Sequence, residues 1–285
     1  MTETHATATT RHVETNGIRY AFRRFGQSSG TPLLFMQHFR GGMDHWDPMV
    51  TDGFAASRPI VLFDNAGVAG SSGNTPETIE AMAGHAADFI SALGLTEIDL
   101  LGFSIGGYVA QTLALRNPRL IRRLILVGTG PRGGEPTTDP DYAADSASTD
   151  PNTGESPLEA FLHLFFSPSE ASQAAGRAFW ERRHRRRVDV DPPSTPQAMA
   201  AQRAAIGEWR KVKGERYAEL RTIGQPTLVV NGNCDVMVPT INSFILSKTI
   251  PNAQLIIYPD SGHGSLFQYP ELFVAHACLF LDGLR

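Results

Sequence analysis

Residues 98–109 have the sequence IDLLGFSIGGYV, in which an apolar run leads to a serine that has a glycine two positions before it and another two positions after it. The run at 98–103 predicts a buried strand, and the small residues of 105–116 predict a helix that ends before Asn117-Pro118. The segment therefore matches G-x-S-x-G in a strand–turn–helix setting, where a strained turn presents a nucleophilic serine, here Ser104. A tight turn without chemistry would have the same local sequence, so the motif needs partners elsewhere in the chain.

Short apolar runs and helical patterns alternate over most of the chain. Strands that are apolar throughout are typical of a parallel sheet buried on both faces, and their alternation with helices indicates βαβ units. Asn16-Gly17 predicts an antiparallel hairpin between 12–15 and 18–25, preceded by a loose tail of about a dozen residues. The other strands are expected at 32–37, 59–63, 121–127, 226–231 and 254–258, and the other helices at 78–93, 239–250 and 265–284.

The alternation stops after Thr129. Residues 130–154 are rich in Gly, Pro, Asp, Thr and Ser, which predicts a loop, and helical patterns without a strand pattern fill 157–217. The strand pattern resumes at Pro226. We therefore expect an α/β core formed by residues 1–129 and 218–285, and a helical lid formed by residues 130–217 on one edge of the sheet.

Two further loops after late strands carry polar side chains that suit a serine nucleophile. Asp235 follows the strand at 226–231, and His263 follows the strand at 254–258. Open α/β sheets place their sites at the carboxyl ends of their strands, so these side chains are expected to meet Ser104. A serine needs a base to take its proton, and a carboxylate fixes the imidazole of that base. Asp260 is the alternative carboxylate, but we favour Asp235 because sequence neighbours often point apart.

The motifs GFSIGG, NGNCDVMVP and SGHGSLFQYPE resemble those of the α/β-hydrolase superfamily in kind and order, and the resemblance covers nearly the whole chain. It implies an α/β-hydrolase fold, a mostly parallel sheet flanked by helices with a helical lid insertion, and chemistry without a cofactor. It implies Ser104 as the nucleophile, His263 as the general base and acid, and Asp235 as the orienting carboxylate.

The same resemblance implies an oxyanion hole made of two backbone amides. One belongs to the residue after the nucleophile, Ile105. The other comes from the loop after the strand at 32–37, where many members of the superfamily have His-Gly and this chain has Gln37-His38. Alignment on a downstream tryptophan makes Phe39 the donor, which we prefer, whereas alignment on the histidine makes it Arg40.

Composition excludes several other classes. The chain has 285 residues, of which 41% are hydrophobic and 19% charged, so it is too apolar to be disordered. Its net charge of −4 gives no electrostatic reason to expect a nucleic acid or an acidic membrane as partner. Two cysteines, no signal-peptide pattern and no long apolar run favour a cytoplasmic protein without a disulfide framework. The nine histidines show no metal-ligand spacing, so a metal is not expected.

The predicted lid carries aromatic residues and an arginine run. Phe161, Phe165 and Trp180 either attach the lid to the core or line an apolar pocket above Ser104, and we name them as candidate substrate contacts. The six arginines of 177–187 are expected to be a solvated surface, with recognition of an anionic substrate as the alternative.

The motifs favour a serine hydrolase that cleaves a carboxylic ester or lactone of a small, partly apolar substrate through an acyl-enzyme. The alternatives on the same fold are a cofactor-free haloperoxidase or perhydrolase, a carbon–carbon bond hydrolase and a small-molecule receptor. Relatives with dehalogenase or epoxide hydrolase activity use an aspartate nucleophile, which Ser104 disfavours. The sequence does not determine the substrate, the choice between water and peroxide, or the oligomeric state.

Overall fold

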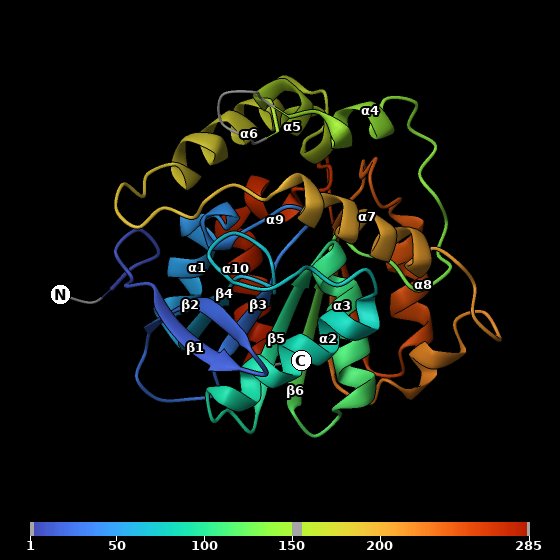
Figure 1. Cartoon of the computed structure of the whole chain (residues 1–285). Helices are drawn as coiled ribbons and strands as arrows, with labels where there is room; N and C mark the ends of the chain where they lie inside the picture. The colour runs from blue at the N-terminus through green and yellow to red at the C-terminus, as the bar shows by residue number, and fades with distance from the viewer. Residues whose placement is uncertain (1–2, 150–155, 284–285) are drawn as a thin grey trace.

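A computed structural model describes residues 3–149 and 156–283. Its centre is an eight-stranded sheet of order β1-β2-β4-β3-β5-β6-β7-β8, in which the strands from β4 onward run parallel (Figure 1). The hairpin of β1 and β2 pairs antiparallel with β4. The mostly parallel sheet predicted from the sequence is therefore confirmed. The strands are β1 (Arg11–Thr15), β2 (Ile18–Gly26), β3 (Leu33–Met36), β4 (Pro59–Phe63), β5 (Ile98–Phe103), β6 (Ile121–Val127), β7 (Thr227–Gly232) and β8 (Ala253–Tyr258).

Central strands supply two hydrophobic clusters, one on each face of the sheet. In β5 every residue is buried; Leu101 and Phe103 belong to one cluster and Leu100 to the other. Successive side chains of a strand point to opposite faces, so a sheet covered on both faces needs strands that are apolar throughout. This requirement explains why the apolar runs located the strands so well.

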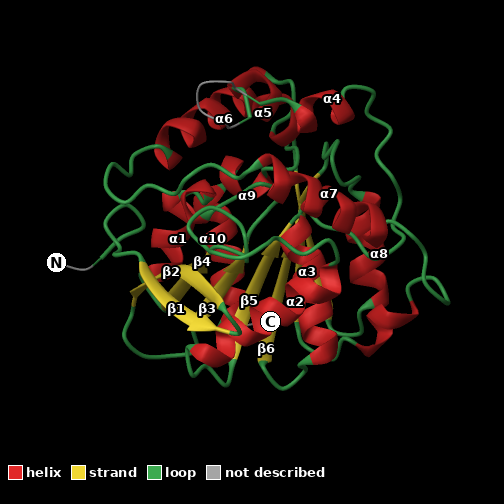
Figure 2. Ribbon diagram, in the orientation of Figure 1, coloured by secondary structure: helices red, strands yellow, loops and turns green. Residues whose placement is uncertain are grey.

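Helices cover both faces (Figure 2). Buried side chains of α2, α3 and α8 join one cluster, and those of α1, α9 and α10 join the other. None of the helices within the described ranges is long and apolar enough to cross a membrane. The bounds are α1 (Pro48–Ala55), α2 (Ile79–Ala92), α3 (Ile105–Arg116), α8 (Ile241–Thr249), α9 (Ser265–Gln268) and α10 (Pro270–Leu281), with short 3₁₀ helices at Met43–His45 and Ala218–Thr222.

Two helices differ from the sequence expectations. α1 was not expected, although Asp47 caps it by accepting a hydrogen bond from Met49 N at 2.9 Å and Pro48 opens it. The helix expected at 265–284 is two helices, because Pro270 has no N–H to continue α9 and instead begins α10. Residue 284 lies outside the described residues.

The segment between β6 and β7 contributes helices only, among the residues that the structure describes. They are α4 (Tyr142–Ala147), α5 (Leu158–Phe165), α6 (Glu170–Arg183) and α7 (Pro196–Trp209). Figure 1 shows α4, α5 and α6 together at one end of the sheet, with α7 between them and the core. We call residues 130–217 the inserted segment; its division from the core at those positions stays a prediction. α4 lies in the stretch 130–154 that we expected to be a loop, and residues 150–155 lie outside the described part.

Buried ion pairs attach the inserted segment to the core, so the expectation of a solvated arginine surface is wrong for three arginines. Arg182 pairs with Asp47, whose carboxylate is fully buried, at 2.5 Å. Arg183 and Arg186 are 5% and 7% exposed. A buried charge is stable only with hydrogen-bonding partners, and residues of the core supply them to Arg182 and Arg186.

The N-terminal residues also differ from the expected loose tail. Residues 4–8 form a turn that buries His5 and Ala8. The carbonyl oxygens of both residues accept hydrogen bonds from the Arg186 guanidinium, at 3.1 and 2.9 Å. The first residues of the described chain therefore pack against the inserted segment.

Candidate active site

Ser104 lies at the turn between β5 and α3, with φ of 56° and ψ of −122°. A positive φ is strained for a residue with a side chain, so surrounding contacts must hold it. The amide of Ser104 donates to Val127 O at 2.9 Å, and the Thr129 hydroxyl donates to Ser104 O at 2.8 Å. The end of β6 thus holds the turn that presents the serine.

The two glycines of the motif are needed for different reasons. A Cβ on Gly102 would lie 2.5 Å from the carbonyl oxygen of Gly106, within the turn itself. A Cβ on Gly106 would lie 2.2 Å from Met36 O, which belongs to the neighbouring strand β3. The first glycine therefore allows the turn, and the second allows α3 to begin against the end of β3.

His263 and Asp235 are brought together from loops 28 residues apart. His263 Nδ1 and Asp235 Oδ2 are 2.8 Å apart, and both side chains are fully buried. The other carboxylate oxygen accepts the amides of Met237 and Val238 at 2.8 and 2.9 Å, which fixes its rotation. Because an ionised carboxylate only accepts, Nδ1 carries the proton and Nε2 of His263 has a free lone pair.

The alternative carboxylate is placed elsewhere. Asp260 accepts hydrogen bonds from the hydroxyls of Ser167 and Ser169, at 2.5 and 2.6 Å, and it is exposed. These hydrogen bonds lower the pKa of Asp260. It therefore binds the serines that precede α6 and is not the hydrogen-bond partner of His263.

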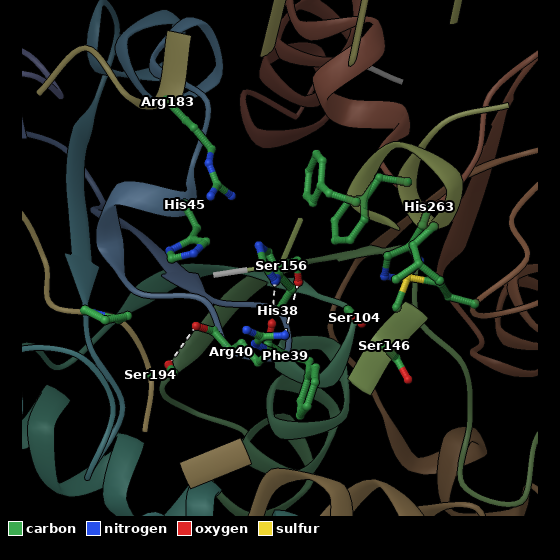
Figure 3. A pocket seen from close by; sticks show the side chains of 15 residues that line it. His38, Phe39, Arg40, His45, Ser104, Ser146, Ser156, Arg183, Ser194 and His263 are labelled. Carbon is green, nitrogen blue, oxygen red and sulfur yellow. Dashed lines mark hydrogen bonds between the residues drawn. The ribbon is translucent and has the colours of Figure 1, made fainter. Parts of the chain in front are cut away.

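Ser104 and His263 line one cavity, shown in Figure 3. Nε2 of His263 is buried and has no hydrogen-bond partner among the described residues, the Ser104 hydroxyl included. Hydrogen bonds between a nucleophile and its base often tighten only when substrate is bound. The cavity thus holds a buried serine and an unpartnered basic nitrogen in one enclosed space.

The backbone amides near the cavity distinguish between the two donors considered for the loop after β3. His38 N donates to the side-chain oxygen of Gln37, and Arg40 N donates to that of Gln202 on α7, both at 2.8 Å. No described residue accepts a hydrogen bond from Phe39 N. The amide that we preferred is therefore available, whereas the Arg40 amide is engaged.

The second amide belongs to Ile105, the first residue of α3. The first N–H groups of a helix have no acceptor within the helix, and the helix dipole favours negative charge beside them. The strained turn at Ser104 therefore leaves a free donor immediately after the serine.

The cavity is small, and the inserted segment lines it with equal numbers of apolar and polar residues. Its open volume is about 40 Å³, room for about three water molecules. Phe161 and Phe165 of α5 line it, which is one of the two roles considered for them. Trp180 is not among its described lining residues; instead it stacks under the Arg183 guanidinium at 4.1 Å, and Arg183 lines the cavity. A larger substrate thus needs these side chains to move or a second space beside Ser104.

His38 lines the cavity, and the sequence analysis did not name it as a site residue. Its Nδ1 lies 2.8 Å from Phe39 O, so Nδ1 carries the proton, and its Nε2 is buried without a described partner. Burial lowers the pKa of His38 to about 3, which keeps the ring neutral. The signal was present in the sequence, because a histidine occupies the position where the superfamily commonly has glycine.

Arg40 connects the loop after β3 to the inserted segment. Its carbonyl oxygen accepts from the Ser194 hydroxyl at 2.7 Å, and its guanidinium donates to the Ser156 hydroxyl at 3.1 Å (Figure 3). With the bond from its amide to Gln202, these contacts hold the loop that carries Phe39. Within the described ranges no group of three His, Cys, Asp or Glu is placed to hold a metal ion.

Comparison with known proteins defines the class of this protein. The family profile described as alpha/beta hydrolase fold matches residues 31–270, and the chain belongs to that family. It is similar to an alpha/beta hydrolase fold protein from Chitinophaga pinensis, with 42% identity, a TM-score of 0.92 and coverage of 99% of this chain and 100% of that one.

Two relatives with named activities are hydrolases. A pimeloyl-[acyl-carrier protein] methyl ester esterase from Nitrosomonas europaea is 31% identical over 61% of this chain and 67% of its own length. A 2-hydroxymuconate semialdehyde hydrolase from Pseudomonas sp. (strain CF600) is 25% identical over 93% of this chain and 91% of its own. These similarities support a hydrolase on this fold.

Proposed function

We propose that this chain hydrolyses a carboxylic ester through an acyl-enzyme on Ser104. The observation that carries the proposal is the unpartnered Nε2 of His263, fixed as an acceptor by Asp235, in the cavity that also contains Ser104. The similarity to a methyl ester esterase supports the ester as substrate class.

In the proposed first step, Ser104 Oγ attacks the ester carbonyl carbon while Nε2 of His263 takes the hydroxyl proton. The carboxylate of Asp235 stabilises the imidazolium that forms, without taking the proton itself. The buried position of this pair strengthens the interaction, because water does not screen it.

Negative charge develops on the carbonyl oxygen during the attack. In the proposal, the amides of Phe39 and Ile105 donate to that oxygen, and loss of one such donor typically lowers turnover by about 10²–10³-fold. The tetrahedral intermediate collapses, and His263 returns its proton to the leaving alcohol. Water, activated by the same imidazole, then attacks the acyl-enzyme and releases the acid.

In this proposal, the aromatic side chains that line the cavity bind the apolar part of the substrate. Phe161 and Phe165 contact it directly, since both line the cavity. Trp180 acts indirectly, because its ring holds the Arg183 guanidinium in place.

The test is a series of 4-nitrophenyl esters with acyl chains of two to eight carbons, together with mass spectrometry after treatment with a fluorophosphonate. Turnover and a covalent adduct that both disappear in Ser104→Ala, and persist in Ser247→Ala on the distant helix α8, are expected. No turnover and no adduct with the native chain would overturn the proposal. Ser104-dependent cleavage of a vinylogous diketone acid, with no ester hydrolysed, would replace it by carbon–carbon bond hydrolysis.

A further inference from the structure

A second, larger cavity also reaches Ser104. Its volume is about 270 Å³, and it shares Ser104 and Phe39 with the cavity already described. Residues of α4 and α7 form its outer wall, the two helices seen at the right of the inserted segment in Figure 1. It is therefore the space beside the serine that can take an extended part of a substrate.

Arg203 of α7 and Arg210, the residue that caps the C-terminus of α7, line this cavity. Arg203 and Arg210 are seven residues apart, which places them two helical turns apart on one face. Arg203 donates to the backbone oxygen of Ser146 at 2.7 Å, and Arg210 donates to the hydroxyl of Tyr142 at 3.2 Å. Both partners are neutral, and neither guanidinium forms an ion pair with a carboxylate of the described residues. Within the described ranges, these two positive charges at the cavity thus have no carboxylate in ion-pair contact.

Aromatic rings hold these guanidinium groups in position. The Arg203 guanidinium carbon lies 5.5 Å from the centre of the Phe39 ring, and that of Arg210 lies 5.5 Å from the centre of the Tyr142 ring. Such cation–π contacts orient an arginine but leave its remaining N–H groups free to donate. Both arginines are exposed, whereas Ser104 is 7% exposed, so the cavity leads from a positively charged mouth to the serine.

Tyr108 adds a donor inside the cavity. Its side chain is 7% exposed, and its ring stacks on Trp209 with centroids 5.0 Å apart. No hydrogen bond joins its hydroxyl to another described residue. Burial raises the pKa of Tyr108, so the hydroxyl keeps its proton and can donate. No aspartate or glutamate is among the described lining residues. The polar groups here therefore suit a ligand that accepts hydrogen bonds.

We propose that this cavity binds a carboxylate carried by the substrate, so that the preferred esters are anionic half-esters of dicarboxylic acids. Arg203 and Arg210 attract and bind the carboxylate, Tyr108 donates to it, and Ile206, Met237 and Val238 contact the methylene chain between it and the ester. This inference rests on the proposed function for the reaction at Ser104, but the binding of the anion can be measured without turnover.

The experiment uses the full chain with Ser104→Ala, which cannot turn the ester over. Calorimetry compares monomethyl adipate, an anion, with dimethyl adipate, its neutral counterpart. We expect at least about tenfold tighter binding of the anion, weakening as salt screens the charges. Arg203→Gln combined with Arg210→Gln should remove that preference, and Tyr108→Phe should reduce it. Arg185→Gln combined with Arg187→Gln, the same loss of two positive charges at exposed positions of the inserted segment outside the cavity, should retain it.

A parallel measurement with the native serine compares kcat/KM for 4-nitrophenyl hydrogen adipate and 4-nitrophenyl hexanoate. Equal binding of the two adipates, or a preference that survives the double arginine substitution, would overturn the anion site. A charge preference in binding without Ser104-dependent turnover would leave the anion site standing and overturn the proposed hydrolase. If the double variant does not fold, the salt dependence and Tyr108→Phe decide: a preference insensitive to both contradicts the proposal.

Discussion

Replacing Asp235 by asparagine tests the proposed triad with almost no change of shape. The oxygen that accepts the amides of Met237 and Val238 must remain an oxygen, so the new NH₂ group faces His263 Nδ1. An NH₂ group donates, and Nδ1 then has to accept. The proton of the imidazole moves to Nε2, the nitrogen that has to take the proton of Ser104.

The magnitude follows from the burial of the pair. Restoring the working tautomer would place two N–H donors against each other at a site where both side chains are fully buried. Each unsatisfied buried donor costs about 1–3 kcal/mol, so the two together cost about 2–6 kcal/mol. Since about 1.4 kcal/mol is a factor of ten, kcat should fall between about 30-fold and about 10⁴-fold. Loss of the negative charge beside the imidazolium adds to the effect, so we expect about 10³–10⁴-fold.

The assay is hydrolysis of the best 4-nitrophenyl ester, with the melting temperature as the check on folding. Asp260→Asn is the matched control, because Asp260 is three residues from His263 and hydrogen-bonds elsewhere. Its kcat should stay within about twofold of the native value. An Asp235→Asn variant that keeps more than a tenth of the native kcat would refute the reasoning, as would an equal loss in the control.

Three further predictions concern stability, measured by urea unfolding. Burial lowers the pKa of His5 to about 4, so the folded chain keeps it neutral while the unfolded chain binds a proton below about pH 6.5; stability therefore falls as pH decreases through this window. His5→Gln should remove about 3 kcal/mol of that fall, and an equally steep profile in the variant would contradict this. Gly106→Ala should prevent stable folding because its Cβ would meet a carbonyl of β3 at 2.2 Å, whereas Gly84→Ala, with open space around it in α2, should add about 0.5–1 kcal/mol; similar effects would count against the account of the motif. Arg182→Met should lower the free energy of unfolding by about 3–5 kcal/mol, because it leaves a buried carboxylate unpaired. Arg177→Met, on the same helix but half exposed, should lower it by less than about 1 kcal/mol. Equal losses in the two variants would contradict the attachment of the inserted segment by a buried ion pair.

The strands and the serine turn could be predicted because their signals are local. β5 is apolar throughout, and the glycines of its turn are needed within five residues of one another. Ser104, Asp235 and His263 each follow a predicted strand, and this placement predicted that they meet at one edge of the sheet. The hydrogen bond between His263 and Asp235 agrees with that expectation, whereas Asp260, the carboxylate nearer in sequence, accepts hydrogen bonds from two serines instead.

Features that depend on distant partners could not be predicted. Arg182 sits in a run that looks solvated, and only the approach of Asp47 from the core makes its burial favourable. His5 looks like part of a loose tail, yet it forms hydrogen bonds with Thr51 and Arg186, which are 46 and 181 positions away along the chain. In both cases the sequence pattern around the residue carries no information about the partner.

What the sequence by itself determined is the class of fold and the residues able to carry the chemistry, because strand periodicity and turn sterics act over a few residues. What only the tertiary structure decided is which groups remain free to react or to bind. Gln202 of α7 accepts from the amide of Arg40, whereas the amide of its neighbour Phe39 has no acceptor among the described residues. Arg203 and Arg210 face a cavity that reaches Ser104 because α4 and α7 meet over it. Hydrogen bonds and charges depend on distances in space, and the folded chain sets those distances between segments far apart in the sequence.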